Sequence, residues 1–325
     1  MTYVPTIQPI AHIAAGRTAD CALRYITSGV PVVVTRAAAH WDAVGKWSFS
    51  WFAEHFHDRS VTVTLDGPLS GNRCKMRMGD YLQLIENPQL DAPPYVRLEP
   101  LPGVLPELMA DFAMPVHCPS GRAIMVHLWL GPANTVQPFH KDNLNPLAAI
   151  DNILVQIRGR KAVSLVSADQ DELMYPYPAG SVHANYSQVA FPRADLDRFP
   201  AFRDARVTEA LIEPGDMVFI PSDTWHHVRS LEPSVSLSFW WYQSAIADLI
   251  AALTSAPGAD RASPLGTQSR QAIDELAVAE FGGIWAFALA ARTVPGQRRR
   301  LLDGACTTAV ADELAEALRH IESRR

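Results

Sequence analysis

The chain has few cysteines, no long apolar run and no extended basic segment, and each absence excludes a class of protein. Its four cysteines, among 325 residues, are scattered without the spacing of a zinc site or a disulfide framework. That usage favours reduced thiols and a cytoplasmic location. No stretch is apolar enough to span a bilayer, and the N-terminus lacks a charged segment followed by an apolar run. The net charge of −6 and the short arginine runs lead us to expect neither a nucleic-acid nor a membrane partner.

What is present is enough apolar sequence, 48% of the chain, for one large core with an appendage. Residues 1–120 mix helix and strand patterns, and residues 121–245 are rich in strand patterns. Residues 246–325 change to an Ala/Leu-rich helical pattern, in which an apolar stripe recurs with helical spacing at Val310, Leu314, Leu318 and Ile321.

The strand patterns predict a mainly β fold with flanking helices. Short β-branched or alternating runs predict strands at 31–35, 61–64, 123–130, 152–157, 161–166, 217–221 and 235–242. Ser48 is positioned as the N-cap of a helix that begins near Phe49. We expect the strands at 152–157 and 161–166 to form a hairpin through Gly159. Antiparallel strands joined by Pro-Gly-Asp turns favour a sandwich or jelly roll, that is, a double-stranded β-helix.

The motif most indicative of chemistry is His140-Lys141-Asp142, followed much later by Trp225-His226-His227. Two histidines and one carboxylate form a face on a metal ion that leaves coordination positions open. In a strand, residues i and i+2 point to the same side, so His140 and Asp142 are able to share one ion. Each motif alone has a simpler interpretation, as a hydrogen-bonded surface pair or as a core histidine beside an aromatic ring.

With these motifs in order, the region from Pro31 to Tyr242 resembles the JmjC/cupin family of Fe(II)- and 2-oxoglutarate-dependent oxygenases. It is most similar to hydroxylases of the factor-inhibiting-HIF type. The matching blocks are the segments at 137–142, 152–161, 173–178, 198–202, 214–221 and 225–228. The resemblance implies a JmjC/cupin-like catalytic domain at 1–245 with a jelly-roll core at 121–245. It implies a helical dimerisation segment at 246–325, and hence a homodimer.

The resemblance also implies the ligands and the cosubstrate contacts. His140, Asp142 and His226 match the iron ligands, with O2 as the other substrate. Lys161 matches the lysine that binds the distal carboxylate of 2-oxoglutarate. Without the resemblance, Lys161 would be taken for a surface lysine at the end of a hairpin. Asn152 and Tyr95 match further polar residues around the cosubstrate.

The chain departs from the factor-inhibiting-HIF type near the substrate. Gln137 and Ser238 stand where that type has a threonine and an asparagine in contact with the cosubstrate, and both can still form hydrogen bonds. Asn185 and Tyr186 stand where it has an Arg-Gln pair that grips an asparagine amide. We therefore do not carry asparagine hydroxylation over. Together with Trp240, these two residues are expected to form part of the substrate wall.

The function that follows is a 2-oxoglutarate-dependent dioxygenase that hydroxylates an unactivated C–H bond of a protein, a peptide or a small molecule. Two alternatives stay open: a metal-dependent cupin enzyme that does not use 2-oxoglutarate, and a non-catalytic metal-binding cupin. The segment at 169–206 is too long for an ordinary connection. It is expected to be either a part of the substrate wall or a structural cover packed by its own aromatic residues.

Overall fold

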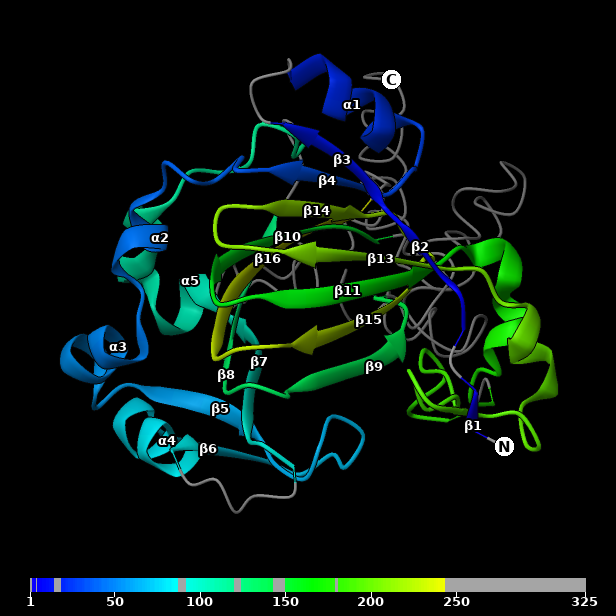
Figure 1. Cartoon of the computed structure of the whole chain (residues 1–325). Coiled ribbons are helices and arrows are strands. Elements are labelled where there is room, and N and C mark those ends of the chain that lie inside the picture. Colours follow the sequence, from blue (N-terminus) through cyan, green and yellow to red (C-terminus); the bar gives the residue numbers. More distant parts are fainter. Residues whose placement is uncertain are drawn as a thin grey trace, which may run out of the picture. The chain divides into compact units, whose positions relative to one another are not determined.

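The described part of the chain folds around two β-sheets that face each other (Figure 1). The structure is a computed structural model, and it describes residues 2–3, 5–14, 19–86, 92–119, 124–142, 150–178 and 181–242. The predicted helical segment at 246–325, with its apolar stripe, lies outside the described residues. No helix within the described ranges is long and apolar enough to cross a membrane.

Within the described ranges, the larger sheet has nine strands in the order β3-β4-β14-β10-β16-β8-β7-β5-β6. The bounds are Ala11–Ala14 for β3, Val32–Thr35 for β4, Ser60–Thr64 for β5, Arg73–Arg77 for β6, Tyr95–Pro100 for β7, Met125–Gly131 for β8, Ile150–Arg158 for β10, Met217–Ile220 for β14 and Ser234–Tyr242 for β16. The strands predicted at 31–35, 61–64, 123–130, 152–157, 217–221 and 235–242 are all present, which confirms those predictions.

The smaller sheet has five strands among the described residues, in the order β2-β13-β11-β15-β9. Their bounds are Ile7–Pro9, Val207–Ile212, Lys161–Val166, Trp225–Ser230 and Val136–His140. Alternate residues of these strands point to opposite faces of the sheet. Val163 and Leu165 of β11 belong to the core between the sheets, whereas Val166 belongs to a second cluster.

The principal core lies between the sheets and draws buried residues from both of them. It contains Val33, Tyr95, Trp129, Leu154, Val218 and Ile220 from the larger sheet, and Val163, Leu165, Ala210 and Ile212 from the smaller sheet. This two-layer arrangement, together with the strand order, confirms the predicted jelly-roll core. Strands that converge on one interior bring ligands that are far apart in sequence to one place.

The long segment at 169–206 is mainly a structural cover. It contains the 3-10 helices η2 (Ala168–Met174) and η3 (Pro200–Asp204), and the short strand β12 (Ala194–Asp195), which pairs with β1 (Thr2–Tyr3). Its apolar side chains pack with Phe139, Val166 and Trp225 in the second cluster. Those three residues belong to β9, β11 and β15, so the segment covers the outer face of the smaller sheet.

The predicted hairpin between 152–157 and 161–166 is wrong. Both strands exist, but β10 belongs to the larger sheet and β11 to the smaller one. Gly159 makes the crossing with φ +69°, and a Cβ at this position would lie 2.3 Å from the Pro233 carbonyl oxygen. The Gln156 amide donates to the carbonyls of Arg158 and Gly159, at 2.6 and 2.9 Å. The local turn signal was correct, but tertiary packing sends the second strand to the other sheet.

Helices lie at both edges of the larger sheet and along one of its ends (Figure 1). The predicted cap is confirmed: Ser48 precedes α3 (Phe49–Phe56), and its hydroxyl accepts a hydrogen bond from the Trp51 amide at 3.1 Å. The other helices are α1 (Ala19–Thr27), α2 (Asp42–Lys46), α4 (Met78–Ile85), α5 (Leu101–Val104) and the 3-10 helix η1 (Pro106–Asp111).

Candidate metal centre and adjoining pocket

Three side chains of the type that binds metals meet at one end of the space between the sheets. One ligand atom from each of His140, Asp142 and His226 lies within 4.8 Å of the others. The Asp142 Oδ1 atom is 3.6 Å from Nε2 of His140 and 3.3 Å from Nε2 of His226. All three side chains are buried. The structure therefore brings together the three predicted ligands.

The strands deliver these ligands through an irregular pairing of β9 with β15. His140 is the last residue of β9 and pairs with His226, whereas Val228 pairs with Gln137. Two steps along β15 thus correspond to three steps along β9, so β9 carries an extra residue. The bulge turns both Gln137 and His140 toward the pocket. Asp142 lies beyond the last residue of β9. The expected alternation of side chains along a strand therefore does not by itself explain where the Asp142 carboxylate lies.

Hydrogen bonds fix the two imidazoles with Nε2 directed at the centre. The His140 Nδ1 atom lies 2.8 Å from the Pro138 carbonyl oxygen and 3.0 Å from that of His226. The His226 Nδ1 atom lies 3.0 Å from the Thr224 carbonyl oxygen. A carbonyl only accepts, so each Nδ1 carries the proton and each Nε2 presents a lone pair, as a metal-binding histidine requires.

A second polar group orients the carboxylate. Asn152 on β10 donates from Nδ2 to the Asp142 Oδ2 atom at 2.8 Å, which leaves Oδ1 facing the imidazoles. The Asn152 Oδ1 atom is buried and has no hydrogen-bond partner among the described residues. Asn152, predicted to contact the cosubstrate, lines the same pocket, and its amide nitrogen also orients the Asp142 carboxylate.

The electrostatics of the cluster match a site prepared for a cation. Burial alone would raise the pKa of Asp142, but the nearby imidazoles of His226 and His140 hold it well below its usual range. Burial and the neighbouring His226 lower the pKa of His140. Burial also opposes the charge on His226, but the Asp142 carboxylate outweighs it and raises the pKa of that imidazole. A fixed carboxylate with a neutral histidine is a donor set that favours a divalent metal ion.

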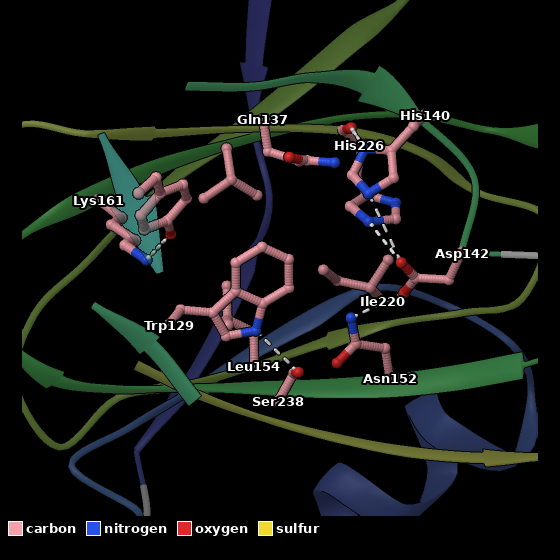
Figure 2. A pocket seen from close by; sticks show the side chains of 12 residues that line it. Trp129, Gln137, His140, Asp142, Asn152, Leu154, Lys161, Ile220, His226 and Ser238 are labelled. Atoms are coloured by element: carbon pink, nitrogen blue, oxygen red, sulfur yellow. Dashed lines mark hydrogen bonds and ion pairs between the residues drawn. The ribbon is translucent and has the colours of Figure 1, made fainter. Parts of the chain in front are cut away.

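A pocket extends from the three ligands between the two sheets. Figure 2 shows Lys161 at the end opposite the ligands, with Gln137 and Trp129 between them. The remaining walls are Tyr95, Leu154, Ile220, Val228, Asn152 and Ser238. A cation at one end and a metal-type site at the other define a pocket for an elongated anion.

Lys161 is a buried cation and not the surface lysine of the simpler interpretation. Its side chain is 1% exposed, and its Nζ atom donates to the Tyr95 hydroxyl at 3.1 Å. No carboxylate of the described residues forms an ion pair with it. Burial lowers the pKa of Lys161 to about 7. A buried ammonium without a counter-ion is costly, so an anionic ligand at this position would stabilise the charged form of the side chain.

Two residues that depart from the factor-inhibiting-HIF type, Gln137 and Ser238, form hydrogen bonds inside the pocket. Gln137 Oε1 accepts from Arg97 Nη1 at 2.9 Å, and Gln137 Nε2 donates to the Tyr186 hydroxyl at 2.9 Å. Ser238 Oγ accepts from Trp129 Nε1 at 2.9 Å. Among the described residues, nothing accepts from the Ser238 hydroxyl hydrogen or from the second Gln137 amide hydrogen, so both can serve a ligand.

The two adjacent histidines point to opposite faces of β15. His226 lines the pocket, whereas the His227 ring packs against Phe139 and Phe191, with ring centroids 5.5 and 5.0 Å away. Burial lowers the pKa of His227 to about 4, and its Nε2 atom has no hydrogen-bond partner in the described structure. The register places only the first histidine at the cluster.

Of the three residues predicted in the substrate wall, Tyr186 lies closest to the metal-type cluster. Its ring stacks on His140, with centroids 5.3 Å apart. Asn185 instead holds the ligand segment from outside, since its Nδ2 donates to the Lys141 carbonyl at 2.9 Å and its carbonyl accepts from the Lys141 amide at 2.9 Å. Trp240 lies on β16, two residues beyond Ser238, and its ring meets His127 with centroids 4.8 Å apart.

Some lining residues were missed from the sequence. Trp129, Leu154, Ile220 and Val228 line the pocket, although their patterns are those of ordinary buried strand residues. Arg97, which donates to the lining residue Gln137, was missed as well, and its position two residues after Tyr95 is the one signal that would have suggested it. Apolar residues inside a barrel do not reveal from sequence which of them contact a ligand.

Comparisons with known proteins agree with this geometry. The cupin-like domain family matches residues 19–246. Lysine-specific demethylase 8 of Xenopus tropicalis is 33% identical over 67% of this chain and 49% of its own length. Lysine-specific demethylase JMJ30 of Arabidopsis thaliana is 31% identical over 68% and 52%, and Jumonji C domain-containing protein 5 of Drosophila melanogaster is 25% identical over 73% and 63%.

The chain thus spans about half the length of the first two of these relatives. The family match covers most of the described residues, including the two sheets and the metal-type cluster. The resemblance to the factor-inhibiting-HIF type in particular stays a prediction. The chain belongs to the cupin-like domain family.

Proposed function

We propose that the chain is an Fe(II)- and 2-oxoglutarate-dependent dioxygenase that hydroxylates an unactivated C–H bond. The observation that carries this proposal is the buried Lys161, held opposite a cluster of two histidines and one carboxylate. A metal-binding cupin that does not use a dicarboxylate has no reason to bury a cation there. The family membership supports the same class of enzyme.

The described residues fit the proposed metal and cosubstrate. Two imidazoles with outward-held protons and one oriented carboxylate form the ligand set of non-haem iron oxygenases. His140, Asp142 and His226 would hold Fe(II). Lys161 and Tyr95 would bind the distal carboxylate of 2-oxoglutarate. Gln137, Ser238 and the free oxygen of Asn152 offer further polar contacts along the pocket.

The mechanism assigns a physical task to each part of the chain. Bound iron would supply the oxidative chemistry, in which a substrate C–H group, O2 and 2-oxoglutarate yield the hydroxylated substrate, succinate and CO2. The Asn152 amide keeps one Asp142 oxygen toward the imidazoles. Lys161 balances the charge of the cosubstrate where water is excluded. The apolar walls formed by Leu154, Ile220 and Val228 keep the pocket dry.

The substrate would bind at the open side of the metal-type cluster. We propose that it is a protein or peptide side chain or a small molecule. Tyr186 and Trp240, with Asn185 behind the ligand segment, form the proposed substrate wall. The names of the relatives indicate demethylation of lysine by those proteins. A methylated lysine peptide is therefore the first substrate to test, before unmodified peptides, amino acids and metabolites.

The test is calorimetric titration of 2-oxoglutarate into protein with and without Mn(II), an unreactive substitute for Fe(II). We expect tighter binding in the presence of the metal, because both ends of the cosubstrate then have a partner. Succinate formation with Fe(II) and O2, stimulated by a substrate from the screen, would complete the assignment. Metal binding without metal-dependent binding of 2-oxoglutarate would favour a different cupin enzyme, and absence of both would favour a non-catalytic cupin.

Two further proposals concern the setting of the enzyme. We infer a homodimer formed through residues 246–325, from their predicted apolar stripe. We also infer a reducing, cytoplasmic location from the cysteine usage. Cys74 and Cys118, which lie within the described residues, are free thiols, and this agrees with that location.

A further inference from the structure

A second cavity, separate from the metal centre, lies beside the cosubstrate pocket. It shares Tyr95 with the first pocket. We call it the Thr64–Arg97 cavity. Its lining consists of Thr64, Gly67, Pro68, Ala92, Pro93, Tyr95, Arg97, Asn134, Thr135 and Val136.

Two polar atoms in this lining are buried without a partner. Thr64 is 4% exposed, and its Oγ1 atom has no hydrogen-bond partner in the described part of the chain. The Arg97 Nε atom is buried and equally lacks one. Thr64 pairs with Tyr95 across β5 and β7, and Arg97 follows Tyr95 by two residues. The three side chains therefore belong to one face of the sheet.

The described part of the lining carries charge of one sign. Among its described residues Arg97 is the cation, and there is no aspartate or glutamate. Arg97 Nη1 is engaged with Gln137 Oε1 at 2.9 Å. The opposite edge of the guanidinium, formed by Nε and Nη2, has no acceptor among the described residues. Two parallel N–H groups on such an edge match the two oxygens of a carboxylate.

We propose that the Thr64–Arg97 cavity binds a small carboxylate ligand that is distinct from the cosubstrate. The carboxylate accepts from the Nε and Nη2 edge of Arg97 and from the Thr64 hydroxyl. The apolar remainder of the ligand lies against Pro68, Pro93 and Val136. Burial of a hydroxyl and a guanidinium edge is costly in the absence of such an acceptor.

The cavity is connected to the metal-type cluster by hydrogen bonds and stacking. Arg97 donates to Gln137, Gln137 donates to the Tyr186 hydroxyl, and the Tyr186 ring stacks on His140. The shared Tyr95 also contacts Lys161 at 3.1 Å. A carboxylate on Arg97 therefore acts on groups that position both a metal ligand and the cosubstrate lysine, which makes its binding sensitive to the state of the first pocket.

The experiment measures binding and does not depend on turnover. Protein with Mn(II) is first saturated with N-oxalylglycine, an unreactive analogue of 2-oxoglutarate, so that the first pocket is filled. Propionate, succinate, inorganic phosphate and uncharged propionamide are then titrated in turn by calorimetry. The variants are Thr64→Val, which keeps the side-chain shape, Arg97→Met, which keeps the length, and Thr62→Val as a control outside the lining.

We expect saturable binding of propionate or succinate, and none of propionamide. Arg97→Met should weaken that binding about tenfold or more, Thr64→Val should weaken it several-fold, and Thr62→Val should leave it unchanged. Without probe, Thr64→Val should keep or raise the melting temperature, since it removes a buried unpaired hydroxyl, and this shows that the variant folds.

Absence of saturable carboxylate binding would overturn the proposal. Equal affinity for propionamide, a preference for phosphate, or binding that both variants leave unchanged would overturn it as well. Because binding of N-oxalylglycine is measured as a separate step, failure of the proposed oxygenase function is distinguished from failure of this second site.

Discussion

At the scale of single residues, the burial of Lys161 has the clearest energetic consequence. Replacing Lys161 by alanine leaves a 2-oxoglutarate carboxylate unpaired in a buried pocket. We expect a loss of roughly 3–5 kcal/mol in binding free energy, as for a broken buried ion pair. Metal affinity should change little, because Lys161 lies at the far end of the pocket from the ligands (Figure 2). Titration calorimetry with Mn(II) measures both quantities.

The neighbouring Arg160→Ala variant is the matched control for Lys161→Ala. Arg160 is exposed and forms an ion pair with Glu232 at 2.6 Å, outside the pocket. It should bind 2-oxoglutarate like the unaltered protein. A Lys161→Ala protein with unchanged cosubstrate affinity would show that another cation binds the distal carboxylate.

The same lysine predicts a pH dependence of cosubstrate binding. Burial lowers the pKa of Lys161 to about 7 from 10.5, so the free protein loses this charge as the pH rises through neutrality. A dicarboxylate binds the protonated form, so binding at pH 8 should take up a proton and weaken as the pH rises further. Calorimetry in buffers of different ionisation enthalpy detects the proton. Heats that do not vary with the buffer would contradict the lowered pKa.

The contribution of Lys161 to folding stability changes with pH in the direction opposite to that of a lysine that gains an ion-pair partner on folding. Above pH 7 the native side chain is largely neutral, while the unfolded chain still binds the proton up to the ordinary lysine pKa of 10.5. The unfolded state therefore holds more protons in that window, and the contribution of Lys161 to stability rises with pH. Below pH 7 both states are charged, and the penalty for burying the ammonium is constant.

The adjacent histidines give a test of strand register at the same scale. His226→Ala should abolish tight metal binding, because it removes one of three ligands. His227→Ala should keep metal binding and measurable turnover, because its ring faces Phe139 and Phe191 on the outer side of the sheet. Its cost should be mainly a loss of packing and hydrogen bonding, on the order of 1–3 kcal/mol of stability. The reverse pattern in metal affinity would mean that the register of β15 is shifted by one residue.

At the scale of secondary structure elements, the turn between β10 and β11 decides which sheet each strand joins. Gly159 has φ +69°, and an added Cβ would lie 2.3 Å from the Pro233 carbonyl oxygen. Gly159→Ala should therefore lower the free energy of unfolding by about 2 kcal/mol or more. Because Lys161 follows the turn by two residues, cosubstrate binding should weaken as well. Urea unfolding and calorimetry measure the two effects.

Gly103→Ala is the matched control for this turn. Gly103 lies in α5 with nothing within 4 Å of the position that a Cβ would take, and its φ is not positive. An alanine there should leave stability unchanged or slightly higher, because alanine loses less backbone freedom on folding. Equal effects of the two variants would mean that the Gly159 turn does not fix the path of the chain.

The elements also show how far sequence patterns reach. The strand pattern at 161–166 and the Ser48 cap are local signals, and the structure has a strand and a helix cap at these positions. The choice of sheet for β11 is not local, and a hairpin was therefore the wrong expectation. The extra residue in β9, which turns both Gln137 and His140 inward, depends on the pairing with β15 and leaves no mark in the sequence.

In the candidate site, too, local features could be predicted from the sequence, whereas contacts between distant strands could not. Residue types and their order along the chain were enough to predict the three metal ligands and the lysine. These residues are His140, Asp142, His226 and Lys161. The partners of Asn152 and Gln137 could not, since each depends on a side chain that the fold brings in from a distant strand. The role of Asn185 as a support for the ligand segment was hidden for the same reason.

At the scale of the whole molecule, the remaining prediction is the homodimer through residues 246–325. An amphipathic helix must bury its apolar stripe, and the stripe of Val310, Leu314, Leu318 and Ile321 has either a second copy of the chain or another helix of the same chain as its partner. With a second copy, light scattering should give twice the 35.7 kDa chain mass. Leu314→Glu with Leu318→Glu should then shift the mass to that of one chain while metal binding at His140, Asp142 and His226 is kept. Ala315→Glu, outside the stripe, is the control and should remain dimeric. A single-chain mass for the unaltered protein at micromolar concentration would assign the stripe to packing within one chain.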